Sequence, residues 1–135
     1  SLRAREIMFS AKDSPAVPVG TCMTDAIREV EKYRMGAVFI LDAEDRLFGI
    51  ITDGDIRHMV AKADTDFSAM NVESAMTRHP LNISADSFLY EALNLMEKNQ
   101  ITVLPVVDHD SRFKGMLHLH DILGKGEFKF NGGGK

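Results

Sequence analysis

The chain contains one motif twice. Residues 49–56 read GIITDGDI, and 66 positions later residues 115–122 read GMLHLHDI. The offset stays constant upstream, where identical residues recur without a gap: Ala26 and Ala92, Glu31 and Glu97, Asp42 and Asp108, Arg46 and Arg112. A fixed period of this kind indicates a duplicated structural unit. We expect two copies that pack face to face about a pseudo-two-fold axis, with a cleft between them that suits a ligand.

Each copy predicts a helix, two strands and a second helix, because helical spacing of apolar residues gives way to a short apolar run and a polar turn. The first copy predicts a helix containing Met23–Tyr33 and ending at Met35-Gly36, strands at 37–41 and 47–51, and a helix at about 54–60. The second predicts a helix containing Leu89–Met96, strands at 103–107 and 113–118, and a helix at 119–123. The expected fold class is α/β (α+β in some schemes), with two β-β-α repeats.

Local signals refine these elements. Polar residues that could cap the helices are Thr21 or Thr24, Thr52 or Asp53, and Asp86 or Ser87. Pro105 has no backbone N–H, so it predicts a strand start or a strand at the sheet edge. Gly49 allows a backbone to come close. The expected organisation is repeat 1 at 5–61, a polar linker at 62–71, repeat 2 at 72–124 and a flexible Gly-rich tail at 125–135.

Composition excludes several classes of protein. The 135 residues carry a net charge of −4, which argues against nucleic acid as a partner, since phosphate contacts need surplus Lys and Arg. The single cysteine, Cys22, rules out an intramolecular disulfide and favours a cytoplasmic setting. No apolar run reaches the roughly 18 residues of a membrane span. Because the chain starts with Ser1, we expect it to be part of a longer protein.

The duplicated motif resembles a known family. An apolar strand ending in Asp, a short turn, and then Gly-apolar-apolar-Thr-x-x-Asp opening a helix is similar to a tandem cystathionine-β-synthase (CBS) domain pair. The resemblance covers about residues 6–124, and Leu104–Asp108 and Gly49–Asp55 are its most specific parts. The chain departs from the family pattern at Phe39, where Pro is frequent, and at His118, where Thr or Ser is usual.

A narrower resemblance involves residues 117–123 near the C-terminus, with residues 48–57 and 91–96. These segments are similar to bacterial D-arabinose-5-phosphate isomerases, which join an N-terminal sugar-isomerase (SIS) domain to a CBS pair. Such enzymes interconvert ribulose 5-phosphate and arabinose 5-phosphate on the route to the lipopolysaccharide sugar Kdo. The resemblance implies that this chain is a regulatory region, that its SIS domain is absent, and that CBS pairs associate into a homodimer.

Within the motif, Thr52 and Asp55 have the chemistry of a nucleotide site. The hydroxyl of Thr52 can donate to a phosphate, and the carboxylate of Asp55 can accept two hydrogen bonds from a ribose diol. The N–H groups at the start of the helix favour an anion. The alternative is that both residues only cap the helix.

The family resemblance implies one ligand set in each copy. The first set is Val17, Pro18, Val19, Ala37, Val38, Thr52 and Asp55, and the second is Asn82, Ile83, Val103, Leu104, His118 and Asp121. His118 replaces Thr and donates to phosphate more strongly when protonated. The implied ligands are a nucleotide, such as AMP or ATP, or a nucleotide sugar, with CMP-Kdo as a candidate pathway end product. No cofactor is required.

Other functions find less support in the sequence. His118, His120 and Asp121 could suggest a metal site, but a helix begins there and should spread the side chains apart. No arrangement of nucleophile and base is visible, so whether this chain is an enzyme is left uncertain. The main alternative is a ligand-free dimerisation module of another CBS-containing enzyme or transporter, with apolar helices at the subunit interface.

Overall fold

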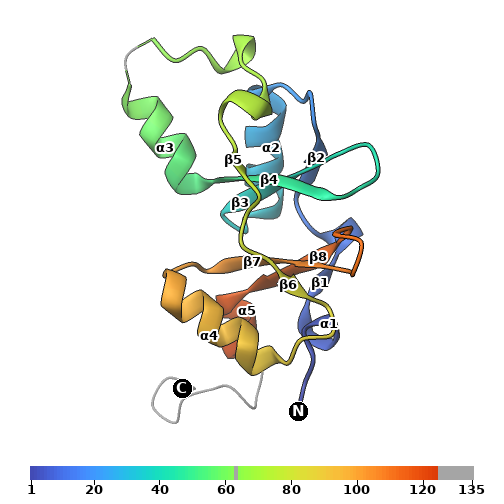
Figure 1. Ribbon diagram of the computed structural model, residues 1–135. Coiled ribbons are helices and arrows are strands. Elements are labelled where there is room, and N and C mark those ends of the chain that lie inside the picture. Colours follow the sequence, from blue (N-terminus) through green and yellow to red (C-terminus); the bar gives the residue numbers. More distant parts are fainter. Residues whose placement is uncertain (63, 125–135) are drawn as a thin grey trace.

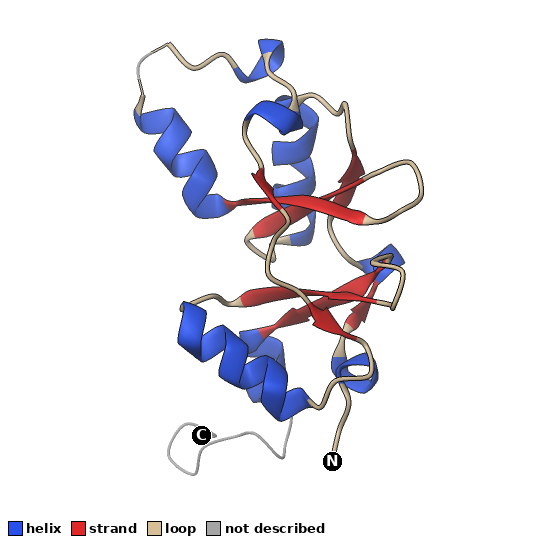
Figure 2. Cartoon of the chain, viewed as in Figure 1, coloured by secondary structure: helices blue, strands red, loops and turns tan. Residues whose placement is uncertain are grey.

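Two four-stranded sheets face each other, and helices cover the outer side of each (Figures 1 and 2). The computed structural model describes residues 1–62 and 64–124. The first half contains β2 (Ala16–Pro18), α2 (Met23–Tyr33), β3 (Ala37–Leu41), β4 (Leu47–Thr52), α3 (Asp53–Ala61) and β5 (Thr77–Arg78). The second contains α1 (Ala4–Ile7), β1 (Phe9–Ser10), β6 (Ile83–Ser84), α4 (Leu89–Asn99), β7 (Val103–Val107), β8 (Phe113–His118) and α5 (Leu119–Gly124). Short 3-10 turns lie at Ala11–Asp13, Phe67–Ala69 and Val72–Ser74.

The duplication extends to details of the backbone. The pairing of β3 with β4 shifts its register between Ile40 and Leu41. The pairing of β7 with β8 shifts between Val106 and Val107, 66 residues later. The helices α2 and α4 both end on a residue in the left-handed conformation, Arg34 and Gln100. The predicted fold class and the two β-β-α repeats are confirmed.

Each half takes one outer strand from the opposite repeat. β1 pairs with β8, and β5 pairs with β4, at the glycine of each motif. A Cβ at Gly115 would clash with the backbone oxygen of Phe9, and a Cβ at Gly49 would lie 2.5 Å from the sulfur of Met76. The close approach at Gly49 is therefore made by the side chain of Met76, just before β5, and not by a backbone as predicted. The boundaries at 5–61 and 72–124 describe sequence repeats, whereas the folded halves exchange their outer strands.

Apolar side chains form three clusters that follow this layering. One cluster lies between the first sheet and α2, and a second lies between the second sheet and α4. The third fills the space between the two sheets, where the rings of Phe39 and Phe113 lie 5.2 Å apart. None of the helices within residues 1–62 and 64–124 is long and apolar enough to cross a membrane.

Helix capping differs from the prediction at two of three positions. Thr52 caps α3 as expected, but α2 follows Cys22 and α4 follows Phe88, neither with a polar side-chain cap. The physical reason is tertiary: the first N–H of α2 donates to the carbonyl of Met70, and that of α4 to the carbonyl of Leu2, each at 2.8 Å. Distant backbone carbonyls thus satisfy donors that a local side chain would otherwise serve.

Two further predictions concern Pro105 and the linker. The edge position predicted for Pro105 is wrong, because Pro105 is the third residue of β7, a central strand. It is tolerated there because β6 pairs only with Val106 and Val107, so no strand needs its missing N–H. Within the predicted linker at 62–71, Phe67 and Met70 pack against the α2 core. The predicted tail, residues 125–135, lies outside the described residues.

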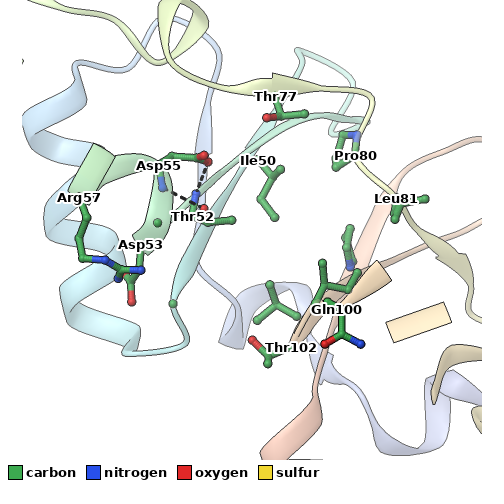
Figure 3. A pocket seen from close by; sticks show the side chains of 15 residues that line it. Ile50, Thr52, Asp53, Asp55, Arg57, Thr77, Pro80, Leu81, Gln100 and Thr102 are labelled. Carbon is green, nitrogen blue, oxygen red and sulfur yellow. Dashed lines mark hydrogen bonds between the residues drawn. The ribbon is translucent and has the colours of Figure 1, made fainter. Parts of the chain in front are cut away.

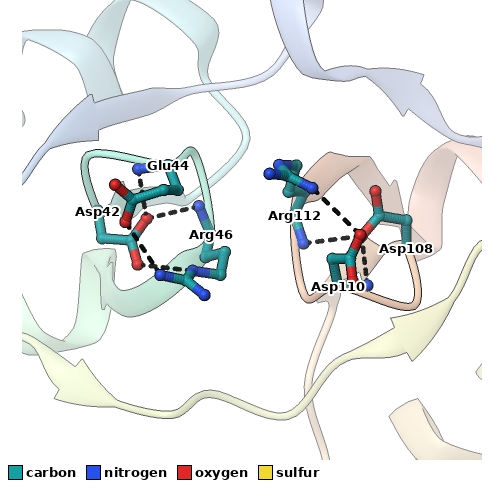
Figure 4. Close-up of polar contacts among 6 residues, drawn as sticks. All are labelled: Asp42, Glu44, Arg46, Asp108, Asp110 and Arg112. Carbon is teal, nitrogen blue, oxygen red and sulfur yellow. Dashed lines mark hydrogen bonds and ion pairs between the residues drawn. The ribbon is translucent and has the colours of Figure 1, made fainter.

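Main-chain hydrogen bonds join the tips of the two central hairpins, whose turns are shown in Figure 4. The N–H of Leu47 donates to the carbonyl of Ser111 at 3.0 Å, and the N–H of Phe113 donates to the carbonyl of Asp45 at 2.9 Å. Within each turn an aspartate accepts two backbone N–H groups: Asp42 from Glu44 and Arg46, and Asp108 from Asp110 and Arg112. These carboxylates hold the turn shape on which the joint between the halves depends.

The Asp42 turn predicts a loss of stability in acid. The backbone N–H of Arg46 is the main reason that the pKa of Asp42 lies below its ordinary value, and its side chain adds to the effect. A lowered pKa in the folded state stabilises the fold above the unfolded pKa of about 3.9, and this contribution disappears as the pH falls through the folded value. We expect Asp42→Asn to show a shallower loss of stability than the wild type below about pH 4 in urea titrations. Glu97→Gln, which changes an exposed carboxylate, is the control. If the free energy of unfolding of Asp42→Asn falls below about pH 4 as steeply as that of the wild type, the argument is contradicted.

Candidate functional site

A cavity of about 610 Å³ lies between the two halves (Figure 3). One wall is the end of β4 and the first turn of α3, and the other is the stretch that runs from the end of α4 into β7. The link between β5 and β6 closes a third side. The lining residues are Gly36, Ile50, Thr52, Asp53, Gly54, Asp55, Arg57, Thr77, Pro80, Leu81, Gln100, Ile101, Thr102, Val103 and Pro105. The volume is in the range of small-molecule sites.

Thr52 and Asp55 form a reciprocal cap at the polar end of this cavity. The hydroxyl oxygen of Thr52 accepts from the N–H of Asp55 at 3.2 Å, and the carboxylate of Asp55 accepts from the N–H of Thr52 at 2.8 Å. The prediction that they cap the helix is therefore confirmed, but capping leaves both side chains with further hydrogen-bonding capacity. The hydroxyl keeps a hydrogen to donate, and a carboxylate has about four acceptor positions. Both side chains can cap α3 and face a ligand at once.

The charged groups of the cavity are gathered at this same helix start. Asp53 and Asp55 lie in the first turn of α3, and Arg57 folds back so that its guanidinium approaches Gly54. Figure 3 shows these side chains together on one wall. Two basic side chains nearby are directed elsewhere: the guanidinium of Arg78 lies 4.9 Å from the centroid of the Phe48 ring, and His79 meets the same ring edge-on.

The opposite wall is uncharged. Ile101, Val103 and Pro105 present apolar surface, and Gln100 and Thr102 add neutral polar groups. Pro105 also shapes the adjoining segment. In the first half, the N–H of Phe39 donates to the carbonyl of Pro15 at 3.0 Å, whereas Pro105 at the matching position has no N–H to give to Leu81. Leu81 is 46% exposed and lines the cavity.

Large side chains fill the position that the pseudo-two-fold axis relates to this cavity. Phe39 stands where the cavity has Pro105, Met116 where it has Ile50, and Met35 where it has Ile101. Phe9, which pairs with Met116, matches Thr77, which pairs with Ile50. Phe39, Met116, Met35 and Phe9 all pack in the cluster between the sheets. The duplicated fold is thus hollow at one of the two related positions and packed at the other.

Three of the predicted site residues line the cavity: Thr52, Asp55 and Val103. Val17, Pro18 and Val19 run along and just beyond the outer strand β2. Ala37, Val38 and Leu104 have no exposed surface, and Ile83 is 9% exposed in the α4 core. Asn82 donates to the carbonyl of Pro80, and His118 and Asp121 lie at the start of α5. As ligand contacts, these residues stay predictions.

The sequence reasoning grouped each site within one repeat, whereas the cavity combines the two. Its helix-start wall comes from the first repeat, and its apolar wall, including Val103, comes from the second. Gln100, Thr102, Pro105 and Leu81 were missed for this reason. The constant offset and the pseudo-two-fold axis could have indicated the pairing, because face-to-face packing puts the helix start of one copy against the strand start of the other.

The surroundings of His118 lower its pKa. Burial is the main cause that lowers the pKa of His118, nearby His120 adds to it, and Asp121 opposes it. Nδ1 of His118 accepts a hydrogen bond from the backbone N–H of His120 at 3.2 Å. Among residues 1–62 and 64–124, no group of three or more His, Cys, Asp or Glu side chains could hold a metal ion.

A smaller cavity of about 300 Å³ lies between α3 and the segment at 65–75. Asp55 lines both cavities, and the smaller one adds two side chains that can carry positive charge, His58 and Lys62.

Comparisons with known proteins agree with this architecture. The model of the CBS domain family matches residues 4–62 and 72–126. Arabinose 5-phosphate isomerase KdsD of Pseudomonas aeruginosa is 35% identical over 125 residues, which cover 93% of this chain and 38% of that protein. The chain thus spans well under half the length of this curated relative.

Solved structures show the same fold. CBSX2 in complex with AMP, from Arabidopsis thaliana, superposes with a TM-score of 0.81 at 21% identity, covering 91% of this chain and 94% of that chain. The CBS domain pair of protein MJ0100, in complex with 5′-methylthioadenosine and S-adenosyl-L-methionine, superposes with a TM-score of 0.77 at 24% identity, covering 90% and 92%.

The cap at the cavity predicts a specific stability effect. Removing the hydroxyl in Thr52→Ala leaves a backbone donor of α3 without its acceptor, so the free energy of unfolding should fall by about 1 kcal/mol in urea denaturation. Thr52→Ser keeps the hydroxyl and should retain most of the stability. If the serine variant loses as much as the alanine variant, the methyl group rather than the cap is responsible.

Proposed function

This chain belongs to the CBS domain family, and on that premise we propose that its cleft binds a nucleotide or nucleotide sugar and so regulates an attached enzyme. The observation that carries the proposal is the cavity itself. It combines a polar end at Thr52 and Asp55 with an apolar wall at Val103 and Pro105, and this pairing suits a ribose phosphate joined to a flat base. AMP, 5′-methylthioadenosine and S-adenosyl-L-methionine in the structural neighbours support this ligand class.

We further propose that the attached enzyme is an arabinose-5-phosphate isomerase. The identity to KdsD over most of this chain, and the small part of KdsD that it spans, support a regulatory region joined to a SIS domain elsewhere in the protein. In that setting CMP-Kdo, a nucleotide sugar, is the candidate effector beside AMP and ATP, and it would connect isomerase activity to lipopolysaccharide synthesis. The cytoplasm is the proposed location.

Regulation would follow from the position of the cleft between the halves. A ligand that contacts α3 on one side and the start of β7 on the other is sensitive to the spacing of the two sheets. It therefore has different affinity for states that differ in this spacing, and differential affinity is what shifts an equilibrium. The link from β5 to β6, which crosses between the halves and lines the cavity, would move with that spacing.

Binding and its stoichiometry test the proposal. We expect one nucleotide per chain in isothermal titration calorimetry with AMP, CMP and CMP-Kdo. Asp55→Asn should weaken binding at least tenfold, since the amide still accepts from Thr52 but replaces an acceptor for the ribose by a donor; a tenfold change is about 1.4 kcal/mol. Asp121→Asn, at the related position of the other repeat, is the matched control and should bind normally.

Two results would contradict this account. Two ligands per chain, or equal losses in the two variants, would place a site at the packed position as well. If none of AMP, CMP and CMP-Kdo binds, a ligand-free dimerisation module becomes the better description of this chain.

We also propose that the chain forms a homodimer through α3. None of the nine residues of this helix is fully buried. Ile56 and Met59 pack partly against the core of the first half, and Val60 lies beside them at helical spacing. Val60 is 62% exposed. An apolar side chain left this exposed next to partly buried ones fits a helix that packs against another subunit.

Sedimentation can test this interface. We expect Val60→Glu to weaken self-association at least tenfold, because it places a charge in an apolar contact. Tyr90→Glu on α4, where Tyr90 is 58% exposed, is the matched control and should leave association unchanged. A Val60→Glu dimer as stable as the wild type would exclude α3 from the interface.

A further inference from the structure

We propose that the charges of the cleft select ligands with a single phosphoryl group over nucleoside di- and triphosphates. This inference rests on the proposed nucleotide function and specifies its ligand class. The ionisable side chains that line the cavity are Asp53, Asp55 and Arg57, so the lining carries two carboxylates and one cation. One guanidinium can pair with one phosphoryl group, and bidentate pairing makes it the natural partner.

The two carboxylates are held in place beside that cation. Asp55 is fixed by its hydrogen bond to the N–H of Thr52, and Asp53 is the first residue of α3. The Oδ2 atom of Asp53 would lie 3.6 Å from a Cβ built on Gly36, so this carboxylate lies against Gly36 in the cavity wall. The start of α3 favours anions, but these aspartates already occupy its first turn. A second phosphoryl group would therefore meet negative charge where the first meets Arg57.

No second cation reaches the cavity from the described residues that line it. The far wall contributes Gln100 and Thr102, which are neutral. The guanidinium of Arg78 lies over Phe48, although Thr77 beside it lines the cavity. Lys62 and His58 line only the smaller cavity, beyond Asp55. A longer phosphate chain would have to pass that carboxylate to find positive charge.

Titration of a phosphate series tests the inference. Dissociation constants are measured in EDTA, so that no divalent cation masks the charge, for adenosine, AMP, ADP and ATP and for the matching cytidine series. We expect the monophosphate to bind most tightly and the triphosphate at least tenfold more weakly. Asp53→Asn should reduce this gap several-fold, and Arg57→Gln should remove the advantage of the monophosphate over the nucleoside. Glu31→Gln, an exposed carboxylate on α2, is the control and should change neither ratio.

The outcomes separate this inference from the function on which it rests. A triphosphate that binds as tightly as the monophosphate in EDTA would overturn the selection while leaving nucleotide binding intact. If that tight binding is lost in Lys62→Ala, the phosphate chain extends into the smaller cavity instead, which also overturns it. Absence of binding by both complete series would overturn the proposed function, and the inference with it.

Discussion

The exchange of outer strands between the repeats is the constraint on which the rest of this structure depends. A strand from the opposite repeat can lie against each motif because the motif begins with glycine, and a Cβ at Gly49 or Gly115 would collide with the incoming segment. Neither sheet is complete without the other repeat, so the halves are held at a defined spacing. Main-chain hydrogen bonds between the hairpin tips, at Asp45 and Ser111, join the two halves at a second place. The cleft exists because this spacing is fixed at both ends.

Duplication supplies two related positions, and divergence decides which of them is hollow. The backbone of the two repeats agrees down to the irregularity in the central hairpins and the left-handed residues after α2 and α4. The side chains do not agree. Phe39 fills the space between the sheets and offers an N–H to Pro15, while Pro105 does neither. The exchange of Phe39 for Pro105, together with the larger side chains of Met116, Met35 and Phe9, thus accounts for the packing of one position and the opening at the other.

The sequence predicted the strands and the repeat well, because both depend on local periodicity and on an offset that needs no structure to see. The strands β3 and β7 have the predicted bounds, and Thr52 caps α3 as expected. The caps of α2 and α4 could not be predicted, since carbonyls of Met70 and Leu2, distant along the chain, replace them. Three of the predicted site residues, Thr52, Asp55 and Val103, line the cavity, but the sequence analysis assigned them to separate sites. Local patterns do not show that one wall comes from each repeat.

Stability and ligand binding are linked in this fold through the residues that they share. Asp55 holds the first turn of α3 and faces the cavity, so a ligand that engages it acts on the anchored end of a helix whose other residues are poorly buried. The contact can therefore order α3 as well as join the halves, and a partner that packs at exposed Val60 would sense the change. A helix with weak burial and a strong cap is suited to this role, because its position depends on few interactions and one of them lies in the site.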